Sequence, residues 1–189
     1  MESLILKPIL LVLFPLSVFL GGIATMSKLT GHDHVTRQLR SKLHPKDAKP
    51  LQERLAGYDL EDVSRLWGAL DDNAYAIEQL YLKIDLVFPF FYGAALTSAL
   101  LIAWSALGTP FHVFWLLSPI AISVAADWAE NLIHLHQLDL FIQGGYDGLQ
   151  STWIRIASFA TTMKFAFLFF ASLMLLGLVV RMLFRPAVS

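Results

Sequence analysis

Four long apolar stretches set the architecture of this chain. They cover residues 4–26, 82–107, 111–133 and 153–184, and polar segments separate them. A helix needs roughly 20 mostly apolar residues to cross the hydrocarbon core of a bilayer. Each stretch reaches that length, so the pattern predicts an all-α, four-helix transmembrane bundle that forms a single integral membrane domain over residues 1–189.

The first stretch has an alternative interpretation as a cleavable signal peptide. Residues 22–24, Gly-Ile-Ala, place small side chains at the spacing of a cleavage site. The apolar run is nearer 20 residues than the roughly 7–15 of a signal-peptide core. Its length therefore favours a retained first span.

The long segment between the first two spans, residues 27–81, is amphipathic. Val35, Leu39 and Leu43 recur every fourth residue with basic residues between them, which predicts a short helix resting on anionic headgroups. From Asp59, a plausible N-cap, apolar positions repeat at helical spacing into the second span, with an interruption at 71–73. The segment is too short and too charged to bury a core of its own, so we expect it to lie on the membrane.

Composition agrees with a membrane protein and restricts its partners. The chain is 56% hydrophobic and 15% charged, whereas a soluble domain carries about 25% charged residues. A net charge of -1 without a basic face argues against nucleic acid, which leaves membrane lipids and a small polar or lipid ligand as expected partners. The absence of cysteine excludes disulfides and thiolate chemistry, and we expect no cofactor. The oligomeric state stays open.

Polar side chains interrupt the third span on one face. Asp127, Glu130, Asn131 and His134 follow one another at i, i+3, i+4 and i+7, so a helix projects all four toward the same partners. The fourth span supplies one cation, Lys164, within an otherwise apolar run. A charge at the bilayer centre costs at least about 2.5 kcal/mol. We therefore predict an ion pair between Lys164 and Asp127 or Glu130.

The second span adds a third acid to this region. Spans that alternate in direction bring Asp85 to the same end of the bundle as the charges above, so we expect it to line the mouth of the same pocket. Tyr81 and Tyr92 share its helix face and are suited to orient a ligand. The candidate ligand-binding or proton-relay residues are Asp85, Asp127, Glu130, Asn131, His134, Lys164, Tyr81 and Tyr92.

The surplus of acids over lysine points to function, and three interpretations remain open. In the first, the polar cluster binds or transports a lipid headgroup, a small polar ligand or a proton. In the second, the protein is an intramembrane enzyme, a hydrolase or a metal-assisted catalyst, that uses the same carboxylates with His134; no residue is assigned as catalytic. In the third, the ion pair only fixes helix packing.

A metal site is a minor alternative within the second interpretation. Asp127, Glu130 and His134 present three ligand atoms on one helix face, but they lack the Glu-x-x-His spacing of di-iron bundles. The pairs His32/His34 and His134/His136 diverge by about 200° on a helix. We expect both pairs at the membrane interface.

Two short patterns lie on consecutive spans: D-x3-P-x2-Y-G beginning at Asp85 and D-x2-E-N beginning at Asp127. In these patterns the chain resembles a set of small bacterial four-span integral membrane proteins of no assigned activity. The resemblance covers mainly spans two and three. It implies that Asp85, Asp127, Glu130 and Asn131 act as one unit, and it suggests a bacterial inner membrane.

The distribution of basic residues predicts the orientation. Cytoplasmic loops carry an excess of lysine and arginine. The end that holds the long loop has ten of the 14 Lys and Arg: Lys28, Arg37, Arg40, Lys42, Lys46, Lys49, Arg54, Arg65, Lys83 and Arg155. The other end has Lys7, Arg181 and Arg185. We expect the 27–81 loop in the cytoplasm and both termini outside.

Overall fold

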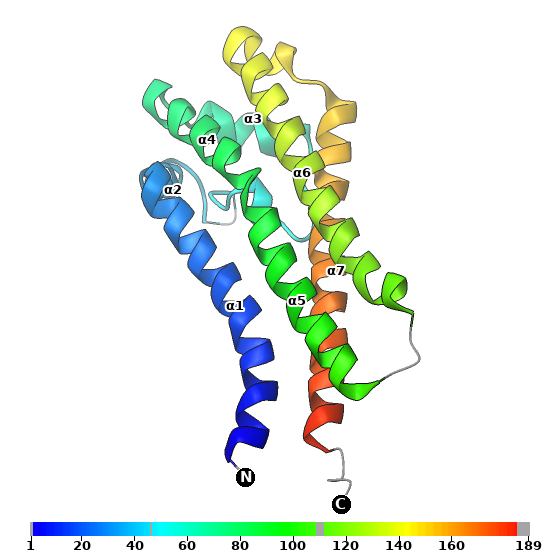
Figure 1. The fold of residues 1–189 in the computed structure, drawn as a ribbon. Helices are drawn as coiled ribbons and strands as arrows, with labels where there is room; N and C mark the ends of the chain where they lie inside the picture. The colour runs from blue at the N-terminus through cyan, green and yellow to red at the C-terminus, as the bar shows by residue number, and fades with distance from the viewer. Residues whose placement is uncertain (1, 46, 109–111, 185–189) are drawn as a thin grey trace, which may run out of the picture.

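The fold is a bundle of long helices with short helices gathered at one end (Figure 1). This computed structural model describes residues 2–45, 47–108 and 112–184, with side chains from residue 8 onward. The elements are α1 (Glu2–Thr30), α2 (His32–Lys42), η1 (Leu51–Glu53), α3 (Leu60–Gly68), α4 (Asp72–Asp85), α5 (Phe88–Leu107), α6 (Val113–Gly144), η2 (Gly145–Gly148) and α7 (Ser151–Leu183). The described residues contain no strand, which confirms the predicted all-α class.

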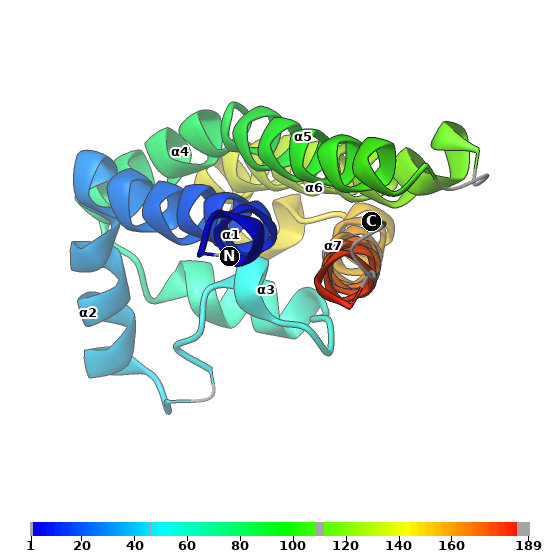
Figure 2. The same ribbon diagram turned by 60° about the horizontal axis from the view of Figure 1, so that its bottom comes forward.

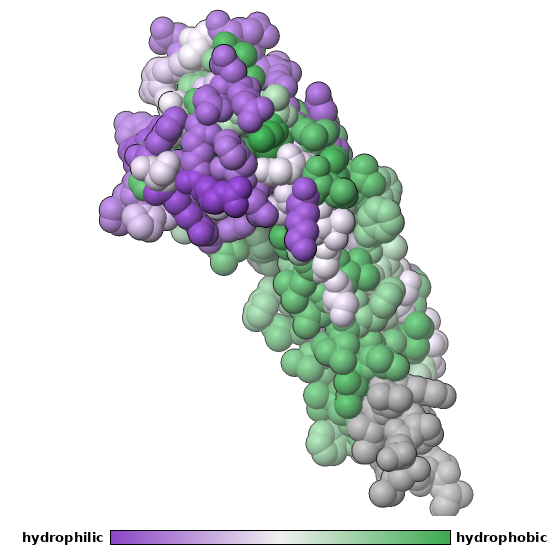
Figure 3. Space-filling view, turned by 90° about the vertical axis from the view of Figure 1, so that its left-hand side faces the viewer, coloured by the Kyte–Doolittle hydropathy of each residue, from purple (hydrophilic) through white to green (hydrophobic). Residues whose placement is uncertain are grey.

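In the part of the chain that the structure describes, four helical segments are long and apolar enough to cross a membrane: Pro8–Thr30, Asp72–Leu107, Val113–Gly148 and Ser151–Leu183. The start of α1 and the end of α7 lie at one end of the bundle, and α2 and α3 lie toward the other (Figure 1). Hydrophilic surface gathers around that second end, and apolar surface covers the remainder of the same face (Figure 3). The predicted four-span architecture is confirmed on these grounds of length and composition.

Some predicted features fall on residues without a described structure. The third span was expected to begin at residue 111 after a tight turn, and residues 109–111 lie outside the described residues. The described part of that helix starts at Val113, where His112 acts as N-cap and accepts a hydrogen bond from the Phe114 amide. Lys46 and Arg185, which contribute to the charge asymmetry, are also outside the described residues.

Helix α6 extends well beyond the predicted end of the third span at residue 133. It runs to Gly144, and Gly145 ends it with a positive φ of 59°. The sequence prediction ended the span at residue 133 because hydropathy falls there, whereas the helix continues with one apolar face and one polar face. Leu138 is fully buried on that extension, in an apolar cluster that also contains Trp67 of α3 and Ile154 of α7.

Polar caps divide the segment that leads into the second span, as the sequence predicted. The Asp59 side chain accepts from the Asp62 amide, and the Asp62 side chain accepts from the Asp59 amide, so α3 begins with a capping box. The Asp71 side chain accepts from the Ala74 amide and caps α4. The helix that was expected to run from Asp59 is therefore two helices.

The apolar face of α2 packs against the protein rather than against headgroups. Val35 and Leu39 are fully buried in a cluster that also contains Trp67 of α3 and the α7 residues Ile154 and Ala157. The expectation that this face rests on lipid is therefore wrong for Val35 and Leu39. Helix α2 lies against α4 and α1, and this packing removes apolar surface from water.

A second apolar core fills the half of the bundle nearer the chain ends. Its buried members are Leu96, Ala99, Leu100 and Ala103 of α5, Leu116 and Ile120 of α6, and Ala171, Leu175 and Val179 of α7. In Figure 2 the end of the bundle where α1 begins points toward the viewer. In this view α5 lies on one side of α1 and α7, and α2 and α3 lie on the other side. The short helices therefore lie beside the α1 and α7 helices.

Candidate functional site

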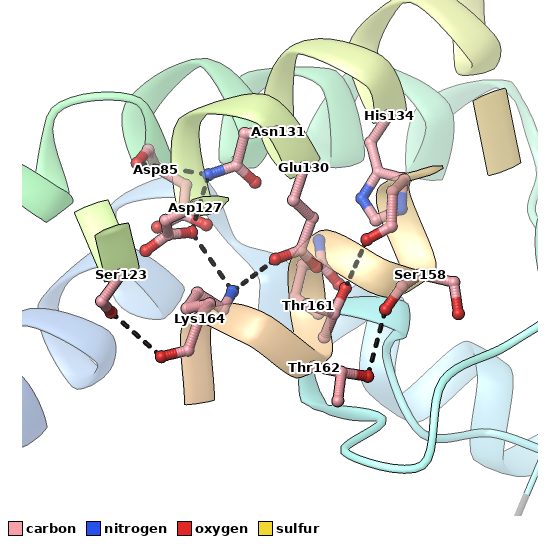
Figure 4. A network of polar contacts seen from close by, with 12 residues as sticks. Asp85, Ser123, Asp127, Glu130, Asn131, His134, Ser158, Thr161, Thr162 and Lys164 are labelled. Carbon is pink, nitrogen blue, oxygen red and sulfur yellow. Dashed lines mark hydrogen bonds and ion pairs between the residues drawn. The ribbon is translucent and has the colours of Figure 1, made fainter. Parts of the chain in front are cut away.

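A buried ammonium group shared by two carboxylates lies between α6 and α7. Lys164 Nζ is 2.6 Å from Glu130 Oε2 and 3.2 Å from Asp127 Oδ1 (Figure 4). The exposed fractions of these residues are 7% for Lys164, 4% for Asp127 and 0% for Glu130. The predicted ion pair is confirmed, and Lys164 pairs with both acids rather than with one.

The polar face of α6 is buried as its spacing predicted. Asp127, Glu130, Asn131 and His134 are all buried. Ser123 lies one turn before Asp127 on the same face, and its hydroxyl donates to the Lys164 carbonyl at 3.0 Å. Three side chains of α6 therefore contact Lys164: Asp127 and Glu130 contact its ammonium, and Ser123 contacts its backbone carbonyl.

A proline break connects α5 to this face. Pro89 has no N–H, so it cannot donate to the carbonyl of Asp85 four residues earlier, and α4 ends at Asp85. The Asn131 amide donates to the freed Asp85 carbonyl at 3.5 Å. The Trp128 indole donates to the next carbonyl, that of Leu86, at 2.9 Å. Two α6 side chains therefore replace helical hydrogen bonds at the break.

A cavity of about 320 Å³ opens beside the ion pair. Its polar lining consists of Lys49, Gln52, Glu53, Tyr81, Asp85, Tyr92, Asp127 and Lys164, and its apolar lining of Phe19, Ile23, Leu55, Phe88, Phe165 and Leu168. Asp85 is 6% exposed, and among the described residues no cation forms an ion pair with it. The structure thus brings Asp85 to the same cavity as Asp127 and Lys164, as expected.

The two predicted tyrosines both line this cavity but have different partners. The Tyr92 hydroxyl donates to Asp127 Oδ2 at 3.0 Å. The Tyr81 ring stacks on His32 with ring centroids 4.1 Å apart. Tyr92 therefore orients the Asp127 carboxylate, whereas Tyr81 connects the cavity to α2.

His134 has a partner that sequence reasoning missed. Its Nε2 is 2.7 Å from the Tyr58 hydroxyl, which also lies 3.2 Å from Thr161 Oγ1. Burial, and secondarily the charge of Glu130, raises the pKa of Tyr58, so this hydroxyl stays protonated. His134 is 1% exposed and does not line the cavity. The His134 side chain therefore faces protein groups rather than headgroups.

His32 is a second buried histidine that was expected at the interface. Its Nε2 is 2.8 Å from Glu78 Oε2, and the Gln52 amide is 3.5 Å from the other oxygen of that carboxylate. His34 and His136, by contrast, are exposed. The sequence signal for this site was Glu78 on the same face as Asp85, but nothing in the spacing identified His32 as its partner.

The three residues considered for a metal do not converge. Asp127 and Glu130 point to Lys164, whereas His134 points to Tyr58. Within the described part of the chain, no three His, Asp or Glu side chains form a group that could hold a metal ion. The geometry therefore gives no support to a metal-assisted mechanism at these residues.

Comparisons with known proteins give no assignment. No protein-family model matches the chain, and no match is found among curated proteins or solved structures. The resemblance of spans two and three to small bacterial membrane proteins therefore stays a prediction.

Replacing the shared ammonium tests the energetics of the site. We expect Lys164→Met to lower the free energy of unfolding by roughly 3–5 kcal/mol, because it leaves two buried carboxylates without a cation. Adding Glu130→Gln should recover part of this loss, since one uncompensated charge disappears. Denaturant-induced unfolding in bicelles measures both values.

The matched control for this substitution is Lys83→Met, which removes an exposed lysine of α4. Its cost should stay within about 0.5 kcal/mol, as for most surface substitutions. Equal losses for Lys164→Met and Lys83→Met would show that the shared ion pair does not stabilise the bundle.

Proposed function

We propose that the cavity is a binding site for a polar ligand that carries a positive charge. The observation that carries this proposal is the Asp85 carboxylate, which lines the cavity and has no cation of its own among the described residues. A charged group in such surroundings needs a partner or must become neutral. A ligand cation beside Asp85 supplies that partner.

The count of charges around the cavity supports a cationic ligand. Lys164 is the one cation in the ion cluster, and it is already shared by Asp127 and Glu130. The cavity lining adds the acids Asp85 and Glu53 and the cation Lys49, so carboxylates still outnumber ammonium groups. In addition, the buried acceptors Glu130 Oε1 and Asn131 Oδ1 have no hydrogen-bond partner among the described residues. The residues around the cavity therefore include more carboxylates than ammonium groups, which favours a donor such as an ammonium over an anion.

Aromatic rings around the cavity support the same ligand charge. Phe88, Tyr92 and Tyr81 line it from α4 and α5, while Phe19 and Phe165 line it from α1 and α7. The faces of aromatic rings attract cations, and the gain grows when the cation is shielded from water. A mostly apolar pocket with a few polar groups is also the usual form of a small-ligand site.

The apolar core nearer the chain ends favours binding over conduction. This core, which includes Ile120 and Ala171, begins about two helical turns from Asp127 and Lys164, and no charged side chain belongs to it. This apolar core therefore offers no charged group that could carry a proton or an ion onward from Lys164. We therefore propose that the ligand enters and leaves from one side of the membrane.

The enzymatic alternative receives less support from the geometry. It needs His134 as an acid or base near the substrate, but the His134 side chain contacts Tyr58 and lies outside the cavity lining. The purely structural alternative explains the contact of Lys164 with two acids. It does not explain why Asp85 lines a cavity beside them.

Ligand binding gives the first test of this proposal. Protein in nanodiscs should bind protonated n-butylamine in calorimetric titrations and should bind butyrate much more weakly. Asp85→Asn should lower the butylamine affinity by about tenfold or more, because it removes a charge-assisted hydrogen bond.

Asp147→Asn is the matched control, since Asp147 is exposed in η2 and far from the cavity lining. Its affinity for butylamine should equal that of the parent protein. Butyrate binding that matches butylamine binding, or an Asp85→Asn variant with unchanged affinity, would rule the proposal out.

We also propose a location, a bacterial inner membrane with the α2–α3 end in the cytoplasm and both chain termini outside. The basic residues at that end support this orientation.

Because the chain has no cysteine, single-cysteine variants report on this orientation directly. In intact cells a membrane-impermeant maleimide should label Ser105→Cys, near the end of α5, and leave Ser41→Cys unlabelled until the membrane is permeabilised. The opposite pattern would invert the proposed topology.

A further inference from the structure

We infer that the ligand is an amphiphile with a protonated amine at one end and a hydrocarbon chain at the other. This inference rests on the proposed function, because it takes the amine to lie beside Asp85. It adds a second site, a neighbouring apolar cavity that receives the chain.

The second cavity lies between α1, α5 and α7 and measures about 360 Å³. Its lining consists of Val12, Pro15, Leu16, Phe19, Tyr92, Leu96, Phe165, Leu168, Phe169, Ser172 and Leu175. It contains no charged side chain. Tyr92 and Ser172 are its two hydroxyl-bearing residues, and the Ser172 hydroxyl donates to the Leu168 carbonyl in its own helix. The lining therefore suits a hydrocarbon group.

The two cavities are adjacent. Four residues line both of them: Phe19, Tyr92, Phe165 and Leu168. Tyr92 marks the boundary, because its hydroxyl donates to Asp127 in the polar cavity while the residue also lines the apolar one. A molecule that spans this boundary has to be polar at one end and apolar at the other.

The apolar cavity is elongated along the helices. On α7 its lining runs from Phe165 to Leu175, about 15 Å at 1.5 Å per residue. On α1 it runs from Val12 to Phe19, about 10 Å. An extended chain fits this shape, whereas a compact polar metabolite would occupy only the cavity that contains Asp85.

The charges select the polar end of the amphiphile. An anionic head such as a carboxylate would meet Asp85 and Asp127. Of the two lysines that line this cavity, Lys164 is already paired twice, and Lys49 is exposed. A protonated amine instead gains a carboxylate partner and the aromatic walls. At a constant chain length, selectivity among amphiphiles should therefore come from the head.

The test compares heads at constant chain length. Radiolabelled dodecylamine, dodecanoate and dodecanol are presented to protein in nanodiscs, and the signal of empty nanodiscs is subtracted to remove partition into lipid. We expect saturable binding of dodecylamine, at least about tenfold tighter than that of the other two, as one charge-assisted hydrogen bond provides.

Filling the apolar cavity isolates the role of the chain. Ser172→Trp and Leu16→Trp place a large ring in it from α7 and from α1, at positions that are exposed and therefore tolerant. Each should weaken dodecylamine binding about tenfold and leave butylamine binding unchanged. Leu173→Trp is the matched control, because Leu173 is exposed on α7 outside the cavity lining.

The outcomes separate this inference from the function on which it rests. Suppose that butylamine binds, and that neither Ser172→Trp nor Leu16→Trp weakens dodecylamine binding. That result would contradict the amphiphile and would still support the cation site. Loss of dodecylamine binding in both variants, with Leu173→Trp unchanged, would support it. Failure of both amines to bind the parent protein would contradict the cation site itself.

Discussion

The structure depends on one electrostatic constraint, the ammonium of Lys164 held by two carboxylates that are buried within the bundle. A lone charge in such surroundings is costly, so the helices that carry the three groups must keep them in contact. Glu130 and Asp127 approach from α6 at 2.6 Å and 3.2 Å, and Ser123 fixes the Lys164 backbone from the same helix. The register between α6 and α7 follows from these contacts.

The same helix face organises α4 and α5 around the site. Pro89 frees the carbonyl of Asp85, and the Phe90 amide donates to Val87 rather than to Leu86. Asn131 and Trp128 of α6 donate to the Asp85 and Leu86 carbonyls. The break that results leaves Asp85 at the end of α4 beside the cavity. One residue that cannot donate a hydrogen bond thus explains both the shape of the second span and the position of its acid.

Sequence reasoning predicted the parts of this arrangement that depend on spacing within one helix or on the cost of a buried charge. It gave the shared face of Asp127 and Glu130 and their contact with Lys164. It missed the contacts of His134 with Tyr58 and of His32 with Glu78, because each joins segments far apart in the chain. It also identified the apolar face of α2 but not the helices that pack against it. A hydrophobic pattern shows that a face is apolar, but it does not show which segment packs there.

The central claim is that the Lys164 ammonium contacts both acids within the bundle. Solid-state NMR of protein in lipid bilayers, with ¹⁵N in the lysine side chains and ¹³C in the aspartate and glutamate carboxyl groups, measures this directly. We expect dipolar couplings from the Lys164 nitrogen to the carboxyl carbons of both Glu130 and Asp127. The coupling to residue 130 should disappear in Glu130→Gln, and the coupling to residue 127 should disappear in Asp127→Asn, because glutamine and asparagine are not labelled with ¹³C. A Lys164 nitrogen coupled to neither carboxyl carbon would contradict the account.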